Sequence, residues 1–253
     1  MPKLMNTDNM QNINISGPGS FQFSSVRIEN LEATEYTIVT IVVDETGSVT
    51  NFAGELLKCV KSIIESCKKS PRSENLLIRL VAFNDKIREI HGFKLLKDIN
   101  INDYKPFKPQ GVTGLYDAAY SSICATLEQA KRLIDQDFDA NGAVYIITDG
   151  LDNCSKMKPQ DIAKRLDEAL HNEKEIESII SILIGLHDIG ISSSNDVQRG
   201  LSYFQAEANI SQFIDVGDAT PAKLAKLAGF VSKSISSQSQ ALGTGGPSQP
   251  LTF

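Results

Sequence analysis

The chain has 253 residues, of which 41% are hydrophobic and 22% charged, so it carries enough apolar material for a sizeable core and is not a disordered protein. Lys and Arg number 25 against 31 Asp and Glu, and the net charge of −6 gives no electrostatic basis for binding nucleic acid. No apolar run is long enough to span a membrane or resembles the core of a signal peptide. The four cysteines show no Cys-x-x-Cys spacing, which favours free thiols in a reducing compartment. We therefore expect a cytoplasmic protein with no membrane span.

Both ends of the sequence differ in composition from its centre. Residues 1–20 are rich in Asn, Gly and Ser and are expected to be flexible, and residues 236–253 form a polar, low-complexity tail that is expected to be disordered. The last apolar residues of that tail, Leu251 and Phe253, could equally form a short docking peptide. Between the ends there is no repeat and no linker, so residues 21–235 are predicted to form a single domain with its core at about 35–235.

Within this domain, apolar β-branched runs of strand length alternate with segments of helical periodicity. This order predicts an α/β fold, namely a doubly wound, mostly parallel sheet with helices on both faces. A short strand near 86–90 is expected to form a hairpin with 76–83 and to give one antiparallel edge strand, and 21–35 can add a further edge strand or hairpin. The predicted strands are 37–43, 76–83, 143–148, 178–184 and 212–216, and the predicted helices are 52–67, 115–134, 162–170, 195–208 and 224–235.

Oxygen-bearing side chains follow two of these strands directly. Ligands of open parallel sheets bind beyond the carboxyl ends of the strands, because the loops diverge there. Asp44, Thr46 and Ser48 follow the first predicted strand, Asp149 follows the strand 143–148, and Thr113 lies between two glycines before the second long helix. Two carboxylates and three hydroxyls suit a hard cation such as Mg²⁺ or Mn²⁺, with Ca²⁺ less favoured. Taken singly, each hydroxyl could instead cap a helix and Asp149-Gly150 could be a turn, but the combination favours a metal site.

These five residues resemble the metal-ion-dependent adhesion site (MIDAS) of the von Willebrand factor type A (VWA) domain. That signature is Asp-x-Ser-x-Ser, then a Thr, then an Asp, and Thr46 stands here where Ser is commonest, as in intracellular bacterial or copine-like members. The resemblance covers about residues 35–235 and implies a Rossmann-like VWA fold. It also implies that the hydroxyls of Thr46, Ser48 and Thr113 touch the metal, while Asp44 and Asp149 act largely through metal-bound waters.

Three functions are open at this point. The first is a metal-dependent protein-interaction module, in which an Asp or Glu of a partner protein completes the coordination of the cation. The second is a phosphatase or phosphotransferase with Asp44 as nucleophile, resembling the haloacid-dehalogenase type; it is disfavoured because Thr46 occupies the place of that family's second Asp. The third is a structural domain with a vestigial site. We expect a protein that is not an enzyme, with Glu45, Gly114, Asp152 and Asn153 on the partner-binding rim.

Overall fold

The computed structural model describes residues 10–15, 21–171, 175–187, 194–246 and 250–253. Within these ranges one sheet of eight strands, in the order β1-β2-β5-β4-β3-β6-β7-β8, is covered by five α-helices. The strands are β1 (Met10–Ile15), β2 (Phe21–Val26), β3 (Glu35–Asp44), β4 (Leu76–Phe83), β5 (Ile87–Leu95), β6 (Asp139–Thr148), β7 (Ser178–His187) and β8 (Gln212–Asp218). The helices are α1 (Ala53–Lys68), α2 (Leu115–Ile134), α3 (Pro159–Leu170), α4 (Ser194–Glu207) and α5 (Pro221–Thr244).

The strand directions agree with the predicted α/β sheet. β3, β4, β6, β7 and β8 pair in parallel, and β5 is antiparallel to β4, as the predicted hairpin required. The β1–β2 hairpin extends the sheet beyond β5. In register, Asp44 pairs with Phe83, and Val43 pairs with Ile147. The carboxyl ends of β3, β4 and β6 therefore lie side by side at one edge of the sheet.

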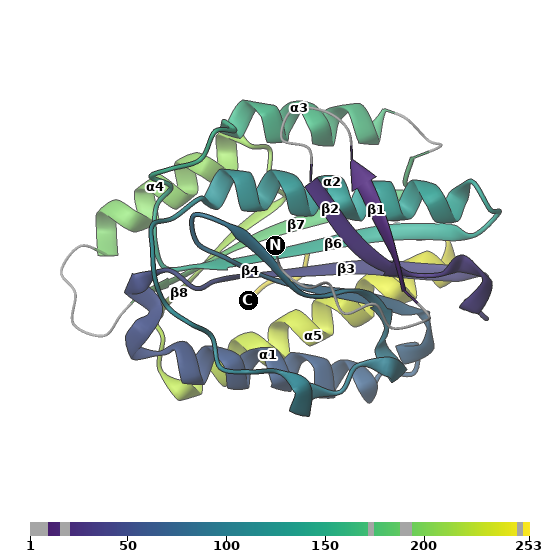
Figure 1. The fold of residues 1–253 in the computed structure, drawn as a ribbon, viewed down its shortest axis with the longest axis horizontal. Helices are drawn as coiled ribbons and strands as arrows, with labels where there is room; N and C mark the ends of the chain where they lie inside the picture. The colour runs from purple at the N-terminus through teal and green to yellow at the C-terminus, as the bar shows by residue number, and fades with distance from the viewer. Residues whose placement is uncertain (1–9, 16–20, 172–174, 188–193, 247–249) are drawn as a thin grey trace.

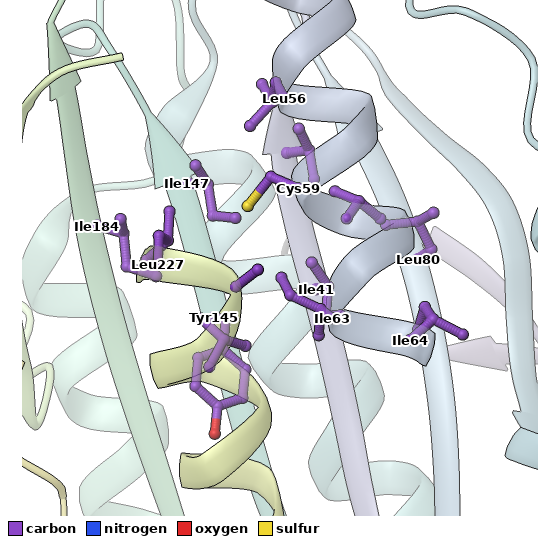
Figure 2. Close-up of a cluster of buried hydrophobic side chains, with 14 of the residues drawn as sticks. Ile41, Leu56, Cys59, Ile63, Ile64, Leu80, Tyr145, Ile147, Ile184 and Leu227 are labelled. Carbon is purple, nitrogen blue, oxygen red and sulfur yellow. The ribbon is translucent and has the colours of Figure 1, made fainter. Parts of the chain in front are cut away.

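Helices cover both faces of the sheet. Figure 1 shows α1 and α5 on one side and α2 and α3 on the other. The side chains under α1 and α5 form one buried cluster, part of which is drawn in Figure 2, where Leu56, Cys59 and Ile63 of α1 face Ile41 of β3 and Ile147 of β6. The opposite face packs on α2, α3 and α4 in a second cluster. β3 and β6 are buried along nearly their whole length, as expected for continuous apolar strands between two helical layers.

The two ends of the chain are more ordered than the sequence predicts. Part of the expected flexible N-terminus is β1, and α5 continues nine residues past the predicted boundary at 235. Leu251 and Phe253 pack on the α1/α5 cluster, and the ring centroids of Phe253 and Phe230 are 5.4 Å apart. Residues 1–9, 16–20 and 247–249, which also belong to the predicted flexible ends, lie outside the described residues.

A buried ion pair joins the β1–β2 hairpin to the rest of the sheet. The guanidinium of Arg79 on β4 donates from Nε to Glu89 Oε2 on β5 at 2.7 Å, and Ser24 of β2 donates from its amide and hydroxyl to the other oxygen of Glu89. Gly92 is required here, because a Cβ at this position would lie 1.9 Å from the carbonyl oxygen of Ser24. We call Ser24, Arg79, Glu89 and Gly92 the hairpin junction.

The cysteines and the helices bear on the predicted free thiols and on the expected lack of a membrane span. All four cysteines are free, with Cys154 exposed and the other three buried. Among the helices of the described residues, none is both long and apolar enough to cross a membrane.

Candidate metal centre

Asp44 ends β3 inside the protein. Its side chain is fully buried, and its carboxylate oxygens accept hydrogen bonds from the Thr46 amide at 2.8 Å and from the Thr148 hydroxyl at 2.6 Å. Burial raises the pKa of Asp44, while the bonds from Thr148 and Thr46 oppose that shift. Within the described chain, no Lys, Arg or His side chain forms an ion pair with Asp44. A carboxylate held in this way is an electrostatic site for an added cation.

A chain of hydroxyl contacts leads outward from Asp44 to the surface. Thr46 Oγ1 lies 2.9 Å from Ser48 Oγ, and Ser48 Oγ donates to Asp149 Oδ1 at 2.7 Å. Thr46 is buried, and Ser48 is exposed in the 3₁₀ turn η2 (Gly47–Asn51) that precedes α1. The four residues from two strand ends are thus brought together at the carboxyl edge of the sheet, as predicted.

Thr113 reaches the same place from the loop before α2. A Cβ at Gly150 would lie 3.7 Å from Thr113 Oγ1, which places this hydroxyl beside the residue that follows Asp149. The backbone of Thr113 is fixed by a reciprocal pair: its amide donates to Asn153 Oδ1 at 2.8 Å, and the Asn153 amide donates to its carbonyl at 2.9 Å. Among the described residues no hydrogen bond to the Thr113 hydroxyl is formed, so this oxygen is available to a ligand.

The capping alternative does not fit the observed helix ends. The N-cap residues are Thr46 for η2, Phe52 for α1 and Gly114 for α2, and none of them makes a side-chain capping bond. The first amides of α2 are satisfied from a different loop, because Asp152 accepts from the Tyr116 amide and Ser155 Oγ accepts from the Asp117 amide. The hydroxyls of Thr46, Ser48 and Thr113 therefore do not cap these helices, so helix capping does not account for their presence.

Of the four predicted rim residues, Glu45 differs most from the expectation. It is buried, and its carboxylate forms two bonds with Arg88 of β5, at 3.0 and 2.6 Å. Gly114 is also buried, and its amide donates to the carbonyl of Asn84 at 2.9 Å. Asp152 and Asn153 lie near the surface, where they fix α2 and Thr113. These contacts hold the loops in place, and no contact with a partner is established for any of the four.

Sequence reasoning missed Thr148, Asn84 and Arg88. Thr148 donates to Asp44 and also accepts from the Gly150 amide at 3.2 Å, so it links the two strand ends. The signal was a hydroxyl directly before Asp149 at the end of an apolar strand. Asn84 and Arg88 act on loops far away in sequence, and no local pattern marks them.

The residues present fit a hard divalent cation. Among the described residues, no three His, Cys, Asp or Glu side chains gather closely enough to hold a metal. The set at this edge is of another kind, with three hydroxyl oxygens and two carboxylates, and it offers only the oxygen ligands that such cations prefer. Its three hydroxyl oxygens are neutral, so direct ligation by them would neutralise less of the charge of a bound cation than direct ligation by carboxylates would.

No protein-family model matches the sequence, and no curated protein matches it. Solved structures do match. The PilB minor pilin from Streptococcus sanguinis has a TM-score of 0.58 and 16% identity over 88% of this chain and 66% of its own. Proximal thread matrix protein 1 from the mussel byssus, with a zinc-occupied MIDAS motif, has a TM-score of 0.51 and 18% identity over 81% of this chain and 47% of its own. A von Willebrand factor type A protein from Catenulispora acidiphila has a TM-score of 0.51 and 14% identity over 90% of this chain and 46% of its own.

These likenesses establish the fold, which is that of a VWA domain. The chain spans just under two thirds of the pilin and just under half of the other two proteins. At this level of identity, what those proteins bind does not transfer to this chain.

Proposed function

We propose that this protein is a metal-dependent protein-interaction module that binds a divalent cation at the carboxyl edge of its sheet and, through the cation, an acidic side chain of a partner protein. The observation that carries the proposal is Asp44, a buried carboxylate without a cationic partner in the described chain, whose oxygens accept hydrogen bonds from the Thr46 amide and the Thr148 hydroxyl. A buried carboxylate that stays ionised requires a compensating positive charge, and here a bound metal ion would supply it.

The residues have different roles in this proposal. Ser48, Thr46 and Thr113 offer hydroxyl oxygens to the cation, and Asp44 and Asp149 hold its charge in place, largely through water. Thr148 and Asn153 are positioning residues, since the first binds Asp44 and the second fixes the backbone of Thr113. When bound, the cation provides a positive charge with an open position that a carboxylate of another protein can fill.

A role as an enzyme has less support. A nucleophilic Asp44 would have to reach a substrate phosphorus, but it is fully buried and both of its oxygens accept hydrogen bonds. Thr46, at the position of the acid/base in the haloacid-dehalogenase type, has no titratable group to perform that role. We propose that the chain has no phosphatase activity, and hydrolysis of p-nitrophenyl phosphate with Mg²⁺ that is lost in Asp44→Asn would contradict this.

The cation and the cellular location are separate proposals. Mg²⁺ and Mn²⁺ suit an all-oxygen set, and Zn²⁺ is included in the test because the mussel protein has zinc in its MIDAS motif. The free cysteines favour a reducing, cytoplasmic location. The pilin among the similar structures makes localisation of the native protein by fractionation a necessary experiment.

Metal binding is tested by calorimetry with Mg²⁺, Mn²⁺ and Zn²⁺ on the wild type and on Ser48→Ala. The matched control is Ser62→Ala, which changes an exposed serine of α1. We expect one site in the wild type and in the control, and an affinity at least about ten-fold lower in Ser48→Ala, because a lost ligand costs more than about 1.4 kcal/mol. Equal affinities in all three proteins, or no binding at millimolar metal by the folded chain, would refute the proposal.

The vestigial alternative needs a second measurement. The metal-loaded protein is titrated with short blocked peptides that contain Asp, with the corresponding Asn peptides as controls. Binding of the Asp peptides that disappears with EDTA supports the interaction module. Metal binding without any binding of carboxylate peptides favours a structural domain with a vestigial site.

A further inference from the structure

Exposed apolar side chains are concentrated around the candidate metal centre. In the described part of the chain, the large hydrophobic residues that are exposed are Ile87, Val112, Leu151, Leu170 and Tyr203. Val112 precedes Thr113, and Leu151 follows Asp149 by two residues. Leu170, by contrast, ends α3, which leads away from this edge. A hydrophobic surface beside a candidate binding site is informative, because single exposed apolar residues are otherwise scattered over a protein.

Leu151 and Tyr203 lie on one surface with Tyr116. Leu151 packs over Gly200 of α4, where a Cβ would lie 2.5 Å from Leu151 Cδ2. Tyr203 follows Gly200 by three residues, so the two positions face the same side of the helix. Burial raises the pKa of Tyr116, and the charges of Asp152 and Tyr203 act in the same direction. The ring of Tyr116 also packs on Phe204 of α4, with centroids 4.6 Å apart.

This surface, which we call the tyrosine–leucine patch (Tyr116, Leu151 and Tyr203), is fixed relative to the metal centre. The loop after β6 carries Asp149 and Leu151 and then Asn153, which holds the backbone of Thr113 by one hydrogen bond to its side chain and one from its amide. In the same loop, Ser155 Oγ donates to Asp152 Oδ1 at 2.5 Å, and Asp152 accepts from the Tyr116 amide. One braced loop therefore positions both a cation ligand and the apolar patch.

The opposite side of the metal centre has different chemistry. There Glu45 is paired with Arg88, whose side chain is 44% exposed, and Lys86, Asp85 and Lys108 are exposed. Ile87 is also exposed on that side, but it stands between Lys86 and Arg88, so the side of α2 and α4 offers the larger apolar surface to a partner.

We propose that the partner segment carries a large apolar side chain within a few residues of the acidic residue, and that this side chain packs on the tyrosine–leucine patch while the carboxylate binds the cation. This rests on the proposed function and adds the sequence preference of the partner. Because the spacing between the patch and the metal centre is fixed, one partner segment can make both contacts. That segment loses its conformational freedom once for the two contacts together, so each contact strengthens the other.

The test is a selection of random 12-residue peptides displayed on phage, performed on immobilised protein in MgCl₂ and eluted with EDTA. The wild type is compared with Leu151→Ser/Tyr203→Ser and with the control Leu170→Ser, which removes an exposed leucine that is not in the patch. We expect peptides selected by the wild type and the control to contain Asp or Glu close to a large apolar residue. The double variant should still select the acid but without the apolar preference.

Affinities then separate the two contacts. For a synthetic peptide selected by the wild type, we expect the double variant to bind about ten-fold more weakly. This corresponds to losing roughly half of the transfer free energy of one buried apolar side chain. Its affinity for Mn²⁺ should stay within about two-fold of the wild type. A parallel fall in Mn²⁺ affinity would overturn the proposal, because the patch would then support the structure of the metal centre and not bind the peptide separately.

Other outcomes are also decisive. Acidic, EDTA-sensitive peptides without an apolar preference would overturn this inference and leave the proposed function standing. Apolar peptides that resist EDTA would contradict both. If the wild type forms dimers by size exclusion that the double variant does not form, the patch is a self-association surface and the inference is wrong.

Discussion

The metal centre and the hairpin junction both bury a carboxylate in the same sheet, Asp44 at the end of β3 and Glu89 within β5, but they neutralise it differently. Glu89 at the hairpin junction is paired with Arg79, and the side chains are 9% and 2% exposed. Asp44 at the metal centre receives only hydroxyl and amide hydrogen bonds among the described residues. A carboxylate that serves the fold obtains its counter-charge from the chain. This difference indicates that the counter-charge of Asp44 comes from outside it.

The largest effect is expected at the hairpin junction. Arg79→Met leaves Glu89 charged and buried, and we expect a loss of about 3–5 kcal/mol in the free energy of unfolding, measured in urea. Arg79→Met/Glu89→Gln removes the uncompensated charge and should lose less than the sum of the two single variants. Strict additivity would show that the two charges are not coupled and would break the comparison.

His91, next to the hairpin junction, gives a pH test of the same region. Burial lowers the pKa of His91 to about 4 from 6.5, and the charges of Lys94 and Arg79 act in the same direction. Since the folded protein holds this imidazole neutral, its stabilisation is complete above pH 6.5 and is lost as the pH falls towards 4. Between pH 8 and pH 5 we expect the wild type to lose about 2 kcal/mol more than His91→Gln in urea unfolding. The same pH dependence in both proteins would contradict the assignment to His91.

A smaller effect is expected for the ion pair beside the metal centre. Arg88→Met leaves Glu45 without its partner, but the guanidinium is partly exposed, so solvent screens the interaction. We expect a loss of about 1 kcal/mol, against no change in the control Lys86→Met, which alters an exposed neighbour. A loss comparable to that of Arg79→Met would mean that Glu45, and not Asp44, is the acid most in need of a counter-charge at this edge.

Much of the fold could be predicted because its strands are continuous apolar runs. β1 is not such a run, because half of Met10–Ile15 is Asn or Gln, and its order comes from pairing with β2. The end of α5 has a similar explanation. Its sequence is polar, and it is ordered by contacts with distant residues: Asn141 Nδ2 donates to the Gln238 carbonyl, and Arg72 Nε donates to Ser239 Oγ.

The candidate site was predicted more completely than the loops around it. Asp44, Thr46, Ser48 and Asp149 follow strand ends directly, so the parallel order of the sheet alone brings them together. Glu45 was misplaced because its partner Arg88 is 43 residues further along the chain. From the local sequence alone, Glu45 is an acidic loop residue. Its burial depends on the hairpin of β4 and β5, which brings Arg88 to it.

The last prediction concerns Asp44→Asn without metal. Unlike the other substitutions, this one is not expected to lower the free energy of unfolding. Removing a charge that has no cationic partner should leave the free energy of unfolding in EDTA unchanged or raise it by up to about 1 kcal/mol. Local geometry allows this, because the new amide can donate to Thr148 Oγ1 while that hydroxyl donates to the Gly150 carbonyl, and the amide oxygen can still accept from Thr46.

With Mg²⁺ or Mn²⁺ at ten times its dissociation constant, the wild type should gain about 1.4 kcal/mol and the variant much less. Urea unfolding of both proteins with EDTA and with metal measures all four values. A loss of several kcal/mol in EDTA would show that the Asp44 carboxylate already has what it needs from the chain, and the contrast with Glu89 would no longer point to a cation.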